Sequence, residues 1–253
     1  MKYNRFLPLL VVVFVAALSE IFFFWPQMIY VIFVLAVLLF FFVARQFTKA
    51  SSKNESWWNY LILPAFFFSG LIVFSSMIPN RFLVQLLFFL NIIFIYIYFR
   101  TIYYYLIKTD YYRNYSMENL SAYGNFLTFY FIASAVYGFQ SFLNISVWFL
   151  IIIMLAATGL IVYQVMWTNK IDIQIGFFYI LLICLVVTEL VWSASFLPLS
   201  FYILGLFLSI CYYMLIGLVK FYLLDKLEKR VIKLYLGFGF FSILIVLFTS
   251  RWM

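Results

Sequence analysis

Two glutamates are the residues best placed to do chemistry in this chain. Glu20 and Glu189 each lie inside a long apolar stretch, where charged residues are otherwise nearly absent. An ionised carboxylate inside a bilayer is costly, so such a residue marks a candidate functional site. If the two carboxylates are adjacent, they can share a proton and bind a cation or carry protons. If they are apart, each is expected to be protonated or hydrogen-bonded to a neighbouring helix.

The composition indicates which elements hold these carboxylates. The chain has 253 residues, of which 68% are apolar and only 9% are charged. A soluble domain is about half apolar and about a quarter charged. We therefore predict an all-α integral membrane protein. The chain has no histidine, which excludes an imidazole base and disfavours a zinc site, so we expect neither a metal nor a cofactor.

Nine segments are long and apolar enough to cross a bilayer as helices. They predict a single polytopic transmembrane domain over residues 1–253, with proline or asparagine at the tight turns. The predicted spans are approximately 6–25, 28–44, 57–78, 82–107, 122–142, 145–167, 173–194, 197–219 and 232–249.

The distribution of cations predicts the orientation. With the N-terminus in the cytoplasm, every one of the 16 lysines and arginines except Arg81 and Arg251 falls on the cytoplasmic side. This is the positive-inside pattern, and it places the C-terminus outside. We expect a bacterial cytoplasmic membrane. In an alternative interpretation, cleavage of a signal peptide after Ala17-Leu18-Ser19 would leave eight spans.

Two features of the predicted cytoplasmic side suggest contacts with lipid. Residues 220–233 have apolar positions at helical spacing, which predicts a short amphipathic helix on the membrane surface. Its cations would contact anionic headgroups, or would serve only as a topology anchor; they are Lys220, Lys226, Lys229, Arg230 and Lys233. Eight tyrosines between Tyr96 and Tyr115 predict an aromatic belt, some members of which could line a headgroup pocket.

The turns on the predicted outer side resemble one another. Ser195–Tyr202 aligns without a gap to Ser141–Trp148, with four of eight positions identical. This favours four tandem helical hairpins plus a ninth helix, although phenylalanine- and leucine-rich spans also match by chance. Glu20 and Glu189 precede an outer turn by six and nine residues, which places each about 9–13 Å below it. Gln85 and Gln140 lie near outer turns too, and we expect them to share an ion- or substrate-binding chamber with the glutamates.

One segment carries a resemblance. Thr188-Glu189-Leu190-Val191-Trp192 is followed by Ser195-Phe196-Leu197-Pro198. The stretch Thr188–Tyr213 resembles part of uncharacterised polytopic membrane proteins from small-genome, candidate-phylum bacteria. The resemblance implies no activity, but it adds weight to Glu189.

The absence of catalytic motifs decides between the functional hypotheses. The sequence has no GxxxxGK[ST], HExxH or GxSxG motif and no soluble domain. It therefore favours a non-catalytic subunit or scaffold of an envelope process over an enzyme. The expected partners are the bilayer, anionic headgroups and a membrane protein, but no nucleic acid. The alternatives are a small transporter or channel that uses Glu20 and Glu189, and an enzyme acting on a lipid-linked substrate at the outer face.

Overall fold

The computed structural model describes residues 6–51 and 55–250, and helices are the only regular elements in those ranges. Nine of these helices are long and apolar enough to cross a membrane, which confirms the prediction of a polytopic all-α protein. They are α1 (Leu7–Phe24), α2 (Ile29–Ala50), α3 (Trp58–Ser75), α4 (Arg81–Leu106), α5 (Ser116–Leu143), α6 (Val147–Thr168), α7 (Ile173–Ala194), α8 (Phe201–Leu223) and α9 (Lys229–Thr249). Two short 3-10 helices, η2 (Pro26–Met28) and η3 (Thr109–Tyr111), lie in connections.

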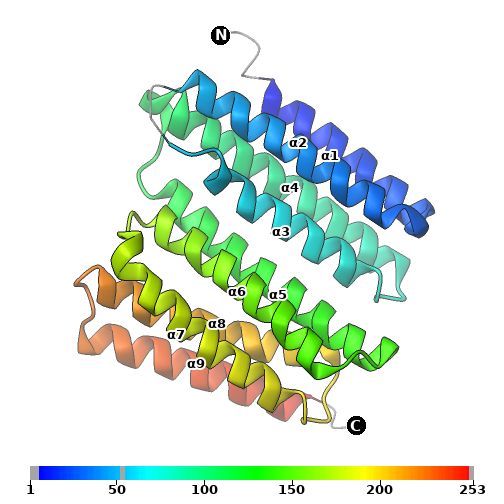
Figure 1. The fold of residues 1–253 in the computed structure, drawn as a ribbon, viewed down its shortest axis with the longest axis vertical. Coiled ribbons are helices and arrows are strands. Elements are labelled where there is room, and N and C mark those ends of the chain that lie inside the picture. Colours follow the sequence, from blue (N-terminus) through cyan, green and yellow to red (C-terminus); the bar gives the residue numbers. More distant parts are fainter. Residues whose placement is uncertain (1–5, 52–54, 251–253) are drawn as a thin grey trace. The chain divides into compact units, whose positions relative to one another are not determined.

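The chain divides into two compact units, residues 1–124 and residues 125–253. In the first unit, α1 packs along both α2 and α4, and α3 packs against α2 and α4 (Figure 1). In the second unit, α6 packs along α7, and α8 contacts both α7 and α9. The extensive pairing of α1 with α4 joins helices that belong to different predicted hairpins.

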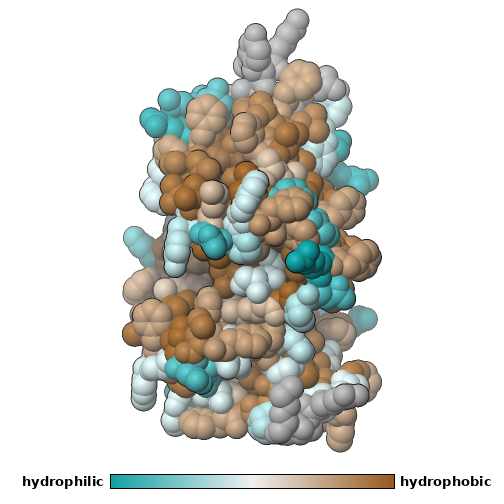
Figure 2. All heavy atoms as spheres, turned by 90° about the vertical axis from the view of Figure 1, so that its right-hand side faces the viewer, coloured by the Kyte–Doolittle hydropathy of each residue, from teal (hydrophilic) through white to brown (hydrophobic). Residues whose placement is uncertain are grey.

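Aromatic side chains form the centre of each unit. In the first unit, Phe40 of α2 stacks on Phe99 of α4 at 5.7 Å between ring centroids and meets Phe68 of α3 edge-on at 6.1 Å. In the second unit, the rings of Phe129 and Tyr212 stack at 4.3 Å. Outside these centres the helices expose apolar side chains, and strongly hydrophilic residues occupy small separate patches of the face drawn in Figure 2. This surface fits lipid as the surrounding solvent.

A proline inside α3 shows how the first unit satisfies backbone groups away from water. Pro64 lies within the helix, and because proline has no N–H, the carbonyl of Tyr60 loses its normal helical donor. The hydroxyl of Tyr98, on α4, donates to this carbonyl at 3.2 Å. An unpaired carbonyl in an apolar interior would cost free energy, so this bond stabilises the α3–α4 contact.

The structure corrects the prediction of a separate surface helix over residues 220–233. Residues 220–223 complete α8, and α9 begins at Lys229. The helix stops because Asp225 adopts a left-handed conformation, with φ of 53°. The N–H of Lys226 then bonds to the carbonyl of Phe221 at 2.9 Å, which is the bonding pattern of a Schellman helix end. All five cations still lie at this turn and its flanking helix ends.

Each unit carries its described cations mainly at one end of its helices. In the first unit Arg45, Lys49, Arg100, Lys108 and Arg113 lie toward the ends that are predicted to be cytoplasmic, and Arg81 begins α4 at the opposite end. Arg45 and Lys49 lie within α2, which is longer than the predicted span 28–44. Lys2, Arg5, Lys53 and Arg251 of the predicted charge pattern lie outside the described residues.

Candidate functional site

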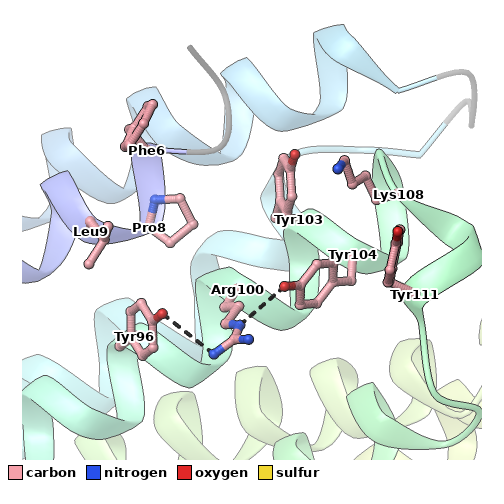
Figure 3. Close-up of a pocket in the computed structure, with 9 residues that line it drawn as sticks. All are labelled: Phe6, Pro8, Leu9, Tyr96, Arg100, Tyr103, Tyr104, Lys108 and Tyr111. Atoms are coloured by element: carbon pink, nitrogen blue, oxygen red, sulfur yellow. Dashed lines mark hydrogen bonds between the residues drawn. The ribbon is translucent and has the colours of Figure 1, made fainter. Parts of the chain in front are cut away.

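A cavity of about 680 Å³ lies between the start of α1 and the last turns of α4 (Figure 3). We call it the first hollow. Its α4 side supplies phenols and two cations, and its α1 side supplies apolar groups. The lining residues are Tyr96, Arg100, Tyr103, Tyr104, Lys108, Tyr111, Phe6, Pro8 and Leu9. The hollow therefore combines positive charge with an apolar wall at the end of a helix pair.

Arg100 lies between two tyrosines one helical turn away on either side. Its Nε donates to the Tyr104 hydroxyl at 3.4 Å, and its Nη1 donates to the Tyr96 hydroxyl at 3.5 Å. Its guanidinium carbon is also 5.7 Å and 5.5 Å from the ring centroids of Tyr96 and Tyr104, within cation–π range. Residues four apart share one helix face, so this arrangement follows directly from their spacing.

The charge of Arg100 remains available to a ligand. The side chain is exposed, and its polar partners among the described residues are the two tyrosines, with no carboxylate. A guanidinium has five N–H donors in a planar fork that matches phosphate. Lys108, just after α4, adds a second cation whose Nζ is 5.4 Å from the centroid of the Tyr111 ring. The site is thus built to attract an anion.

A second hollow of about 260 Å³ adjoins the first. Arg100, Tyr104 and Tyr111 line both hollows. The remaining lining of the second hollow comes from α4, the following loop and the first residue of α5, and consists of Ile97, Thr101, Tyr112, Arg113 and Ser116. Neither lining includes a carboxylate, so positive charge dominates both.

Two carboxylates lie close in sequence to the second hollow: Asp110, next to Tyr111, is exposed and lines neither cavity, and Glu118 is held by a tyrosine. The Tyr112 hydroxyl donates to Glu118 at 3.3 Å and accepts the N–H of Met117 at 3.1 Å. Burial raises the pKa of the Tyr112 hydroxyl; the bond from Met117 opposes this shift, and the charge of Glu118 adds to it. The phenol therefore stays protonated at neutral pH and can continue to donate to Glu118.

The tyrosines of the predicted belt thus divide into different roles. The hydroxyls of Tyr96 and Tyr104 accept hydrogen bonds from Arg100, whereas the Tyr98 hydroxyl donates to the backbone carbonyl of Tyr60 in α3. Tyr105 donates to Glu55, in the loop before α3, at 3.1 Å, and Tyr60 donates to the same carboxylate. The belt is therefore also a set of specific contacts that position the end of α4.

In the first unit, the structure joins two of the predicted site residues. The Gln85 amide of α4 donates to the carboxylate of Glu20 of α1 at 3.3 Å, and the pair is exposed. Glu20 lies four residues before the end of α1 at Phe24, which is about 6 Å along the helix. The predicted depth of about 9 Å was counted to the turn residue Pro26, which lies two residues beyond this helix end.

Among the described residues of the second unit, no hydrogen bond joins Glu189 to Gln140. Glu189 is exposed on α7, five residues before the end at Ala194, or about 7.5 Å along the helix. Its backbone carbonyl accepts from Ser193, but no hydrogen bond involves its carboxylate within the described residues. Gln140 is half-buried near the end of α5. Because Glu20 and Glu189 belong to different units, a shared chamber stays a prediction.

Replacing Glu189 by glutamine is expected to change the free energy of unfolding by less than about 0.5 kcal/mol, because the carboxylate is exposed and unbonded. Gln164→Leu provides a contrast, since the buried Gln164 carbonyl accepts from the Asn125 amide at 2.6 Å. Loss of that acceptor is expected to cost about 1 kcal/mol or more. Unfolding of both variants in detergent micelles measures the difference. Equal destabilisation would show that Glu189 has a structural role.

Sequence reasoning did not select Arg100 as a site residue, although its signal was present. Tyr96, Arg100 and Tyr104 recur at four-residue intervals, which indicates one helix face with a cation between two phenols. No sequence pattern indicated that the start of α1 lines the first hollow, because this depends on the pairing of α1 with α4 in the tertiary structure.

The family comparison covers nearly the whole chain. Residues 8–249 match the model of a family described as "Protein of unknown function (DUF5656)". The chain belongs to the DUF5656 family. No match was found among curated proteins or among solved structures. The family match includes α4, α1 except for Leu7, and the lining of both hollows except for Phe6. It agrees with the resemblance to uncharacterised proteins and extends it far beyond Thr188–Tyr213.

Proposed function

We propose that this multi-pass membrane protein is a non-catalytic subunit or scaffold in a bacterial cytoplasmic membrane, and that its first unit binds the phosphate of an anionic lipid in the first hollow. The observation that carries the proposal is Arg100, an exposed guanidinium without a carboxylate partner among the described residues. Lys108 lines the same cavity. Basic pockets between membrane helices on the cytoplasmic side suit lipid headgroups.

The geometry favours phosphate as the bound group. Arg100 can offer its remaining N–H donors to two phosphate oxygens, while Lys108 contributes a point charge. The phenols of Tyr104 and Tyr111 can donate to further oxygens, since a neutral tyrosine has one O–H. These groups bind and orient an anion, and the lining offers no carboxylate to act as a general base. The site therefore supports binding better than catalysis.

An apolar track favours a lipid as the source of this phosphate. Leu9 lines the first hollow and is 51% exposed. Val13, one turn further along α1, is 67% exposed, and Phe14 follows it. A chain attached to a phosphate in the hollow would lie along these side chains and remove apolar area from its surroundings. A free phosphate would gain nothing from them.

Native mass spectrometry of the purified protein tests this proposal. We expect an anionic phospholipid such as phosphatidylglycerol to be retained in preference to phosphatidylethanolamine with the same acyl chains. An excess of soluble glycerophosphate should not displace it. Displacement by glycerophosphate would identify a soluble phosphate ligand, and equal retention of both lipids would contradict an anion-selective site.

A further inference from the structure

We infer that the two adjoining hollows together hold one lipid with two phosphates, joined by a short polar linker and carrying separate acyl chains. This is the chemistry of cardiolipin. The inference rests on the proposed function and deepens it, because it names the class of lipid and assigns Arg113 to its recognition.

The shared wall between the hollows supports a ligand with two phosphates. Arg100, Tyr104 and Tyr111 line both cavities, so the guanidinium can donate to one phosphate on each side. Each hollow then has a cation of its own, Lys108 in the first and Arg113 in the second. Three positive charges against two phosphate charges suit a ligand that is dianionic near neutral pH. A lipid with one phosphate would leave one hollow unused.

The start of α5 adds a favourable field to the second hollow. Ser116 is the first residue of this 28-residue helix and lines the hollow. A helix N-terminus carries partial positive charge and backbone N–H groups that favour an anion. Glu118 in the same first turn would oppose an anion. Its carboxylate, however, is bound by Tyr112 and does not line the cavity.

Two apolar tracks distinguish this lipid from a diphosphate on a single chain. The first hollow leads to Leu9 and Val13 on α1, as described above. The second hollow includes Ile97, which is 43% exposed, and Ile93 lies one turn further along α4 at 39% exposed. Leu90, at 50%, continues this track. A lipid with acyl chains on both phosphates can cover both tracks, whereas a single-chain diphosphate covers one.

Competition between lipids tests the inference on the full-length protein in detergent. Cardiolipin and phosphatidylglycerol with matched acyl chains are titrated and followed by native mass spectrometry. Wild-type protein is expected to bind cardiolipin about tenfold or more tightly, since the second phosphate adds charge-assisted hydrogen bonds. Arg113→Gln is expected to remove this preference without changing the affinity for phosphatidylglycerol. Arg113 is exposed, so the variant should fold.

The outcomes separate this inference from the proposed function. Selective binding of phosphatidylglycerol with no gain for cardiolipin would overturn the two-phosphate ligand but leave the anionic-lipid site intact. No selective binding of either lipid would overturn both. Stronger binding of a polyprenyl diphosphate than of cardiolipin would show adjacent phosphates on one chain and would also overturn the inference. Displacement of cardiolipin by soluble pyrophosphate would identify a free ligand instead.

Discussion

Arg100→Gln is expected to lower the affinity for anionic lipid by about 10- to 100-fold. The guanidinium supplies charge-assisted hydrogen bonds worth about 1.5–3 kcal/mol in total, and each 1.4 kcal/mol is a factor of ten in affinity. Glutamine keeps a hydrogen-bonding side chain but removes the charge and the planar fork. Arg100→Lys keeps the charge alone and should retain part of the affinity, because an ammonium cannot bind phosphate in a bidentate manner. Lipid titration followed by native mass spectrometry measures all three proteins.

Arg81→Gln is the matched control for this prediction. Arg81 begins the same helix at its opposite end and is exposed, so the substitution changes the net charge of α4 equally. We expect it to leave lipid affinity unchanged. If both variants lost affinity to the same extent, the effect would come from net charge, and the first hollow would not be the binding site.

Gly205→Ala is expected to destabilise the second unit by about 1–3 kcal/mol, the usual cost of overpacking. A Cβ at Gly205 of α8 would lie 2.0 Å from the Ser134 Oγ of α5 and 2.8 Å from the Ser134 backbone nitrogen. The hydroxyl can rotate away, but the backbone of α5 cannot move without separating the two helices. Glycine at this contact allows the close approach that membrane helices use in place of hydrophobic association. Unfolding in mixed micelles measures the loss.

Gly237→Ala on α9 is the same chemical change, but we expect it not to lower the stability of the protein. A Cβ at Gly237 would meet nothing within 4 Å. Alanine is favoured over glycine in a helix interior by about 0.5–1 kcal/mol, so this variant should be as stable as the wild type or more stable. A loss at Gly237 equal to that at Gly205 would mean that the close contact with Ser134 does not decide the effect.

The sequence predicted the spans well because their signals are local. Apolar runs of sufficient length indicated nine helices, and the structure has nine in its described residues. Helix ends were less accurate wherever they depended on backbone geometry. The left-handed Asp225 stops α8 and replaces the predicted surface helix, and α5 begins at Ser116 rather than near residue 122.

The candidate site was predicted less well because its formation depends on which helices are neighbours. Glu20 and Gln85 were selected separately for polarity and depth, and the structure joins them through the α1–α4 pairing. The same pairing places Leu9 opposite Arg100 and creates the first hollow. Helices that are apolar on all sides carry little amphipathic signal to show which face meets which neighbour.

The sequence by itself therefore determined the solvent and the number of spans, because hydrophobicity acts on each span independently. The orientation stays a prediction from the distribution of charge. The tertiary structure alone decided that α1 lies along α4 and that the Tyr98 hydroxyl donates to the Tyr60 carbonyl of α3. It also decided that Arg100 faces two hollows. These features follow from side-chain fit between helices, which in a membrane depends on packing and hydrogen bonds rather than on the hydrophobic pattern along the chain.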